Sequence, residues 1–267
     1  MLIRSTWTLT VAESMVLPRT YALELVKELH RRMGLEMGGT TIPSTTYSGI
    51  LGRCITSGDF ITFQPDEFYQ LSVCGLQETA SKAIASLDLS SKLEFLGATF
   101  EVSDRYDEIT SYEALYQTLV AAEPEPIKRF DLKFLTPTAF AQDRTHLPLP
   151  VPTLMFRSWL ERWNNFAPVY LGSDELISYL GGAIALSYHK IQTYTFRIHQ
   201  GQTTGFKGDV TLKVLGHADP LLANVANLLI HYAQFAGTGI KTRLGMGQVR
   251  VRLASSGVDK DTLVSSL

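Results

Sequence analysis

The stretch GTGIKTRLGMG, residues 237–247, decides how the second half of the chain is expected to fold, because it joins a helix to a strand. Residues 219–237 predict a long helix with Asp219 as its N-cap. Residues 247–254 predict the closing strand. The phosphate loops of nucleotide hydrolases and the glycine loops of dinucleotide-binding proteins lie between a strand and a following helix. The opposite order here argues against both classes.

Moving outward from this loop, the second half shows a regular order of elements. The pattern predicts strands at 130–140, 186–200 and 205–216, a helix at 150–167 and an inserted helix at 173–185. Together with the last helix and strand, the order is β-α-β-β-α-β.

The first half has the same order. The pattern predicts strands at 3–12, 59–64, 68–76 and 92–102, helices at 20–34 and 77–89, and a short further helix at 111–122. Ile3, Trp7, Leu9 and Val11 alternate with polar residues, as in a half-buried strand. Prolines and charges at 123–127 predict a domain boundary.

The fold class is therefore α+β, with two tandem ferredoxin-like (RRM-like) βαββαβ domains at 1–126 and 127–267. Several RNA-binding modules have this architecture, but many unrelated activities use it too. The fold alone does not fix the function.

Charge is distributed unevenly along a chain whose overall net charge is −2. Residues 1–126 carry 9 Lys+Arg and 17 Asp+Glu, whereas residues 127–267 carry 15 and 9. A basic half of this kind suggests a polyanionic partner, although ordinary variation in surface charge would also account for it.

The composition indicates where the protein is expected to act and whether it is expected to hold a metal or a cofactor. With 45% hydrophobic residues, no run long enough to cross a bilayer and no basic leader, the chain is expected to be soluble and cytoplasmic. Cys54 and Cys74 are far apart and indicate neither a zinc site nor a disulfide scaffold. We expect no cofactor and no metal.

The glycines of 237–247 admit two interpretations. Glycine lets main-chain N–H groups approach phosphate oxygens, and Lys241 and Arg243 would supply the charge. Alternatively, the glycines only allow the helix and the strand to pack tightly.

The spacing Gly-Thr-Gly, five residues, Gly-Met-Gly resembles the C-terminal motif of the CRISPR-associated endoribonucleases that process repeat RNA, the Cas6 family. LKFLTPTAFA (132–141), GFKGDVTLKV (205–214) and YAQFAGTGIKTRLGMGQVRV (232–251) are similar to further parts of that family, in the right order. The resemblance covers about residues 130–253. In the first 125 residues only the order of elements matches.

The resemblance implies RNA cleavage without metal, in which a ribose 2′-OH attacks the adjacent phosphate. Such a reaction needs a base, a proton donor and a cation near the phosphate. The family's usual histidine lies at or after the end of the first helix, which points to His30, followed by Arg31. The loop at 34–43 lacks the histidine expected there. Either His30 serves, or Tyr47 and nearby Ser/Thr residues position water and phosphate, or cleavage is lost.

RNA contacts are expected mainly in the second domain, at surface loops and at the glycine-rich loop. They are Arg32, Lys128, Arg129, Arg144, His146, Thr204, Lys207, Gly237, Gly239, Lys241, Arg243, Gly245 and Gly247, with His199 as a further candidate. Arg157 and Arg162 could simply be solvated or paired with Glu161.

Three functions are compatible with the sequence. The favoured one is an endoribonuclease that cuts CRISPR repeat RNA and stays bound to the product, as a subunit of the effector complex. The second is a relative that binds the repeat hairpin without cutting it. The third, a nucleotide-dependent enzyme, conflicts with the helix-then-strand order.

Overall fold

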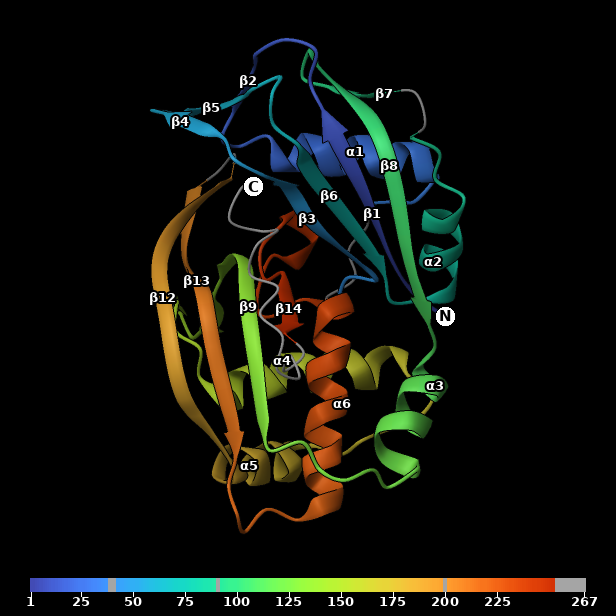
Figure 1. Ribbon diagram of the computed structural model, residues 1–267, viewed down its shortest axis with the longest axis vertical. Helices are drawn as coiled ribbons and strands as arrows, with labels where there is room; N and C mark the ends of the chain where they lie inside the picture. Colours follow the sequence, from blue (N-terminus) through green and yellow to red (C-terminus); the bar gives the residue numbers. More distant parts are fainter. Residues whose placement is uncertain (38–41, 90–91, 199–200, 253–267) are drawn as a thin grey trace.

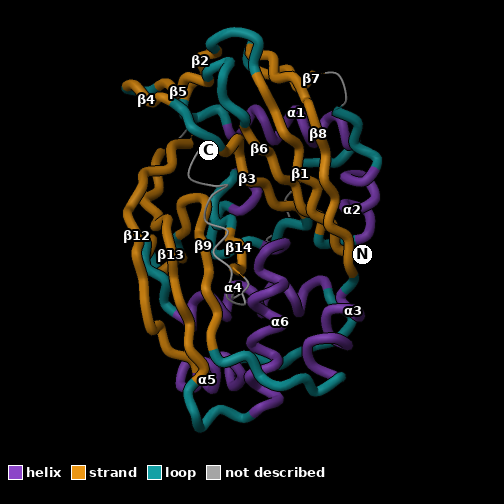
Figure 2. Tube along the Cα trace, in the orientation of Figure 1, coloured by secondary structure: helices purple, strands orange, loops and turns teal. Residues whose placement is uncertain are grey.

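The computed structural model describes residues 1–37, 42–89, 92–198 and 201–252. Two lobes follow each other along the chain, and each is built on an antiparallel sheet with helices packed on it (Figure 1). Figure 2 shows β12, β13 and β9 of the second lobe at the left of the view, with α5 below them and α6 to their right.

The first lobe is built on a five-stranded sheet. Its strands, in spatial order, are β3 (Thr45–Leu51), β6 (Tyr69–Gly75), β1 (Leu2–Thr10), β8 (Ala98–Thr110) and β7 (Lys92–Phe95). The helices are α1 (Ala22–Met33) and α2 (Glu78–Ala85). Ile3, Trp7 and Leu9 of β1 are buried in one apolar cluster with Leu25 and Leu29 of α1, which confirms the predicted core face of this strand. Leu2 and Arg4 on its other face are buried too, so the start of the strand is not half-buried as predicted.

The second lobe contains a four-stranded sheet in the order β12 (Ile184–Ile198), β13 (Gly201–Val214), β9 (Arg129–Thr138) and β14 (Val249–Arg252). Its helices are α4 (Pro152–Phe166), α5 (Asp174–Ala183) and α6 (Pro220–Ala236). The Asp219 carboxylate accepts a hydrogen bond from the Leu222 N–H at 3.1 Å, so the expected N-cap is confirmed.

Both sheets have the strand order of the ferredoxin-like fold. Numbered within each βαββαβ unit, β3-β6-β1-β8 and β12-β13-β9-β14 both run 2-3-1-4. The predicted fold class is confirmed.

Two strand assignments in the first lobe were wrong. The second strand of the unit is β3, not residues 59–64, which form β5 (Phe60–Phe63) in a separate sheet with β2 (Met15–Pro18) and β4 (Ile55–Ser57). Residues 92–102 are not one strand, because a turn at Leu96 and Gly97 divides them between β7 and β8. In both cases a short hairpin interrupts the repeated pattern.

The lobes share part of their interior. α3 (Tyr112–Tyr116) and the following π-helical turn η1 (Gln117–Ala121) contribute Tyr112 and Val120 to the apolar cluster of the second lobe. The Tyr112 hydroxyl donates to the Leu76 carbonyl at 2.8 Å and lies 3.3 Å from the Tyr232 hydroxyl. A division at 126/127 stays a proposal, since this helix packs with the domain that follows it.

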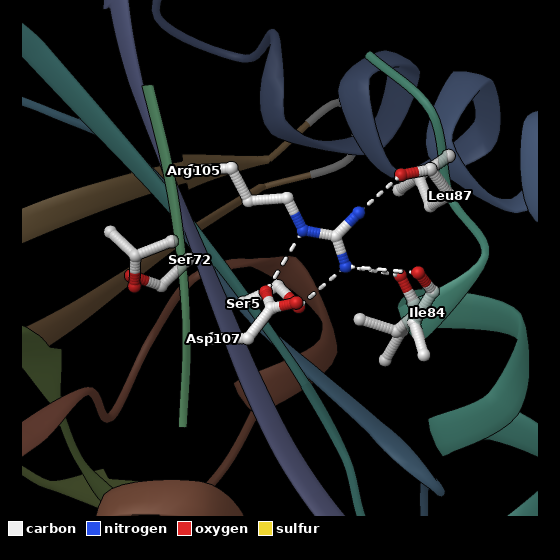
Figure 3. A network of polar contacts seen from close by, with 8 residues as sticks. Ser5, Ser72, Ile84, Leu87, Arg105 and Asp107 are labelled. Atoms are coloured by element: carbon white, nitrogen blue, oxygen red, sulfur yellow. Dashed lines mark hydrogen bonds and ion pairs between the residues drawn. The ribbon is translucent and has the colours of Figure 1, made fainter. Parts of the chain in front are cut away.

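A network around Arg105 shows a charged residue of the first lobe used for structure (Figure 3). Its guanidinium donates to the carbonyls of Ile84 and Leu87 at 3.0 and 2.7 Å, at the end of α2. It also lies 5.0 Å from the Trp7 ring and pairs with Asp107. Carbonyls at the end of a helix lack partners within the helix, so Arg105 fixes α2 against the sheet.

Within the described ranges, none of the helices has the length and apolar character needed to cross a bilayer.

Candidate functional site

A cleft of about 710 Å³ lies between the lobes. One wall comes from the first lobe, from Leu23 of α1 and from Met37, Ile42 and Pro43. The other wall comes from α4 and from the glycine-rich loop, residues 237–247. The loop whose function the sequence left open is therefore part of a cleft between domains.

The glycine-rich loop folds on itself and on the end of β9. The Thr238 N–H donates to Gly247 O at 2.8 Å, and the Ile240 N–H donates to Ala139 O at 3.0 Å. A Cβ at Gly239 would lie 2.1 Å from Ala139 O, and one at Gly247 would lie 2.1 Å from Thr238 O. Glycine is required at these two positions because the protein's own main chain passes there.

This finding favours tight packing, the second of the two interpretations of the glycines. The N–H groups of Gly237, Gly239 and Gly247 donate to Ala233 O, the Ser158 hydroxyl and Pro137 O respectively, so these groups are already used within the protein. The tight-packing interpretation holds for them. Contact of the four glycines, including Gly245, with RNA remains a prediction.

The loop also contacts the first lobe directly. A Cβ at Gly245 would lie 3.2 Å from the Gly49 nitrogen in β3. The Gln248 side-chain amide donates to Tyr47 O at 3.1 Å, and the Thr46 hydroxyl donates to Phe235 O at 2.8 Å. Phe235 and Gln248 flank the loop, so these contacts fix the loop and its two ends against β3, the strand that carries Tyr47.

α4 supports the loop from the other side, which sequence reasoning missed. Arg162 donates to Gly239 O at 2.6 Å and to Ser158 O at 2.8 Å. The Trp159 indole donates to the Thr238 hydroxyl at 2.9 Å. One signal in the sequence could have indicated this support. Ser158 and Arg162 are four residues apart, so they lie on the same face of the helix.

The two cations of the loop both line the cleft. Lys241 precedes the short helix η2 (Thr242–Leu244), and its ammonium donates to the Thr203 hydroxyl of β13. Burial lowers the pKa of Lys241. Arg243 donates to Met37 O at 3.2 Å, so it crosses from the loop to the first lobe.

His30 occupies the last turn of α1 and is only 4% exposed. Its ring is enclosed by Leu35, which follows the end of α1, and by Tyr47 of β3. Its Nδ1 lies 3.3 Å from Leu35 O, and its ring centroid lies 5.8 Å from that of Tyr47. Nε2 is buried and has no hydrogen-bond partner among the described residues.

Burial is the main cause that lowers the pKa of His30, and the positive charge of Arg243 lowers it further. Tyr47 is fully buried, and burial raises the pKa of its hydroxyl while Arg243 acts in the opposite direction. The structure thus brings His30, Tyr47 and Arg243 together.

Arg31 and Arg32 are engaged elsewhere. Both pair with Glu28 at 2.7 Å, and these contacts, led by the hydrogen bond from Arg31, lower the Glu28 pKa to about 2. Arg32 also donates to Lys92 O at 2.9 Å. The structure therefore places the Arg31 side chain on the outer surface of α1, paired with Glu28.

The remaining predicted RNA contacts lie at separate places. Lys128 and Arg129 stand at the start of β9, whereas the glycine-rich loop contacts its end, and Arg129 pairs with Asp131. Arg144 and His146 are exposed at the hairpin of β10 (Phe140–Gln142) and β11 (Thr145–Leu147).

Thr204 and Lys207 lie on β13, Thr204 exposed and Lys207 half-buried, with the Lys207 ammonium 5.0 Å from the centre of the Tyr194 ring. Burial, assisted by Lys133, lowers the Lys207 pKa. His199 lies outside the described residues.

Comparison with known proteins gives three consistent results. Residues 132–249 match the family model of the CRISPR-associated endoribonuclease Cas6. CRISPR-associated endoribonuclease Cas6 of Mycobacterium tuberculosis is 33% identical over 131 residues, 49% of this chain and 41% of the relative. The Streptococcus thermophilus protein of the same name is 29% identical over 123 residues, 46% of this chain and 50% of the relative.

Solved structures agree in fold over nearly the whole chain. A Cas6 product complex superposes with a TM-score of 0.74 at 23% identity and covers 95% of this chain and all of that one. Cas6 of Thermus thermophilus gives 0.67 at 18% identity, over 94% and 98% of the two chains.

The matched segment spans about half the length of the curated relatives or less. The comparisons support the Cas6 family and so confirm the resemblance read from the sequence motifs.

Proposed function

We propose that this chain, for which the comparisons support the Cas6 family, binds CRISPR repeat RNA in the cleft between its lobes and cleaves it there. The observation that carries the proposal is that Arg243 extends from the glycine-rich loop to the corner where His30 and Tyr47 meet. For attack by a ribose 2′-OH, an imidazole can act as the base and a guanidinium can stabilise the charge on the phosphate.

In this reaction His30 Nε2 takes the proton of the 2′-OH. The 2′ oxygen forms a bond to the neighbouring phosphorus, and the bond from phosphorus to the 5′ oxygen of the next nucleotide breaks. The products are a 2′,3′-cyclic phosphate and a 5′-OH, whose proton comes from water positioned by the Tyr47 hydroxyl. Arg243 and Lys241 stabilise the added negative charge on the phosphorane.

The environment of His30 suits the role of a base. Because burial and Arg243 hold its pKa below the ordinary value, the imidazole is neutral at neutral pH and can accept a proton. No metal is used in this mechanism.

A second function is favoured by one specific observation. His30 and Tyr47 are buried in the structure without RNA, so their cover has to move before RNA can reach them. If that movement does not occur, the chain binds repeat RNA and leaves it intact.

Incubation of the purified protein with repeat RNA in EDTA distinguishes the two functions. Cleavage that leaves a cyclic phosphate, and that is lost in His30→Ala but kept in the exposed control His217→Ala, supports the endoribonuclease. Tight binding with intact RNA supports the binding protein. Cleavage that requires added metal would contradict the proposed mechanism.

The chain is further proposed to keep its product and to act as a subunit of a CRISPR effector complex. One solved Cas6 structure is a product complex, which supports product retention. Lys128, Arg129, Arg144, His146, Thr204 and Lys207 would hold parts of the RNA outside the cleft. Product retention predicts that single-turnover and multiple-turnover cleavage rates differ, which quench-flow measurements would test.

A further inference from the structure

Glu161 is an unexpected residue in the cleft. Among the described residues that line it, Glu161 carries the one carboxylate, and it stands among Arg157, Arg162, Lys241 and Arg243. A carboxylate in a site for RNA phosphates weakens binding, because it repels the ligand.

Neither neighbouring arginine forms an ion pair with this carboxylate, although the charge of Glu161 acts on the pKa of buried Arg162 in the direction opposite to burial. Arg157 pairs with Asp174 at 3.1 Å, and Arg162 is occupied by Gly239 O and Ser158 O. Glu161 itself is exposed, and it forms no hydrogen bond or ion pair within 4 Å with any described residue. Its two oxygens are therefore available to a ligand that carries N–H donors.

The surroundings of Glu161 suit a nucleobase. The cleft beside it is partly apolar, with Leu154, Ile240 and Leu244 in its lining, and its volume of about 710 Å³ exceeds that of one base. A second hollow of about 430 Å³, also lined by Glu161, contains Asn165 and the exposed ring of Tyr170. An aromatic surface and amide groups thus lie next to the carboxylate, as in sites for unstacked bases.

The following proposal rests on the proposed function. We propose that a guanine next to the cleaved phosphate leaves its stack and enters this cleft. There Glu161 accepts hydrogen bonds from guanine N1–H and from the guanine 2-amino group. Guanine offers two parallel donors on its Watson–Crick edge, which match the two oxygens of one carboxylate. Adenine, cytosine and uracil each have an acceptor beside the donor on that edge, so they cannot donate to both oxygens of the carboxylate.

The test combines a protein variant with a base analogue. Each guanine close to the cut is replaced in turn by inosine, which lacks the 2-amino group, and cleavage and binding are measured for the unaltered protein and for Glu161→Gln. We expect inosine at one position to reduce kcat/KM about tenfold for the unaltered protein, within the range for removal of half of a bidentate pair. The same replacement should change the variant much less. Glu94→Gln, an exposed glutamate of β7, is the matched control and should retain the full inosine effect.

The outcomes separate this proposal from the proposed function. Cleavage that is insensitive to inosine at every position, or an inosine effect of equal size in Glu161→Gln, would overturn the guanine pocket and leave the endoribonuclease intact. A decrease in thermal stability of Glu161→Gln with an unchanged inosine effect would show that Glu161 only offsets the charge of Arg162. Failure of the unaltered protein to bind or cleave repeat RNA would overturn both.

Discussion

The guanidinium of Arg162 and the carbonyl oxygen of Gly239 are joined by a hydrogen bond of 2.6 Å that ties α4 to the glycine-rich loop. Burial lowers the pKa of Arg162, so the protein holds a charge in an unfavourable environment in order to keep this contact. The shape of the cleft therefore depends on a residue that has no role in the proposed chemistry.

Arg162→Met should destabilise the protein. The substitution removes the guanidinium that donates to Gly239 O and Ser158 O, and a hydrogen bond to a charged group contributes about 1.5 to 3 kcal/mol. We expect a decrease of that size in the free energy of unfolding, measured by urea titration. Arg157→Met is the control, because its ion pair is exposed and should contribute at most about 1 kcal/mol. Equal decreases in the two variants would contradict the role given to Arg162.

Gly239→Ala should disrupt the loop. A methyl group there would lie 2.1 Å from Ala139 O, so β9 and the loop have to separate, and the left-handed backbone at φ 76° adds about 1 to 2 kcal/mol. Thermal unfolding should show a clear decrease in Tm. Gly182→Ala, in α5 with no atom within 4 Å, is expected to raise stability by up to about 1 kcal/mol. A stable Gly239→Ala protein with normal RNA affinity would show that the loop is not held as described.

Lys241→Ala and Arg243→Ala should weaken RNA binding and reduce its dependence on salt. Removing one cation that neutralises a phosphate of a single strand lowers the slope of log K against log salt by about 0.7. Fluorescence anisotropy at several KCl concentrations measures both effects. If affinity and slope stay unchanged in both variants, the loop is not part of the RNA site.

Acid should destabilise the protein through His30. Its folded-state pKa lies below the unfolded value, so the unfolded state binds more protons at mildly acidic pH. The contribution of His30 to the free energy of unfolding is therefore fully present above the unfolded-state pKa, about 6.5, and decreases as the pH falls below it. His30→Gln should flatten this dependence at mildly acidic pH in urea titrations.

His231, whose pKa burial also lowers, should contribute a separate part of the same dependence. A His30→Gln protein with an unchanged pH profile would mean that the ring of His30 is solvated in solution.

Much of the second lobe could be predicted from the sequence, because its signals are local. The Asp219 cap, the apolar α6 and the order of strands all follow from nearby residues. The first lobe was harder to predict, since β4 and β5 form a separate small sheet where the pattern suggested the second strand of the unit.

The site could be predicted only in part. The sequence pointed to His30, Tyr47 and Arg243, which the structure brings together. The sequence did not reveal that His30 is buried. Helical spacing shows on which face of the helix a residue lies, but not which other elements cover that face. Nor could it show that Gly239 is required by Ala139, a residue far away in the sequence whose proximity depends on tertiary structure.

The glycine-rich loop has a consequence for how sequence variation in this chain should be interpreted. Since Gly239 and Gly247 are constrained by the main chain around them, a saturation mutagenesis experiment scored by the proposed RNA binding would report defects at these positions that arise from misfolding. Lys241 and Arg243 line the cleft, so at these loop positions a changed phenotype would instead reflect a change in RNA binding.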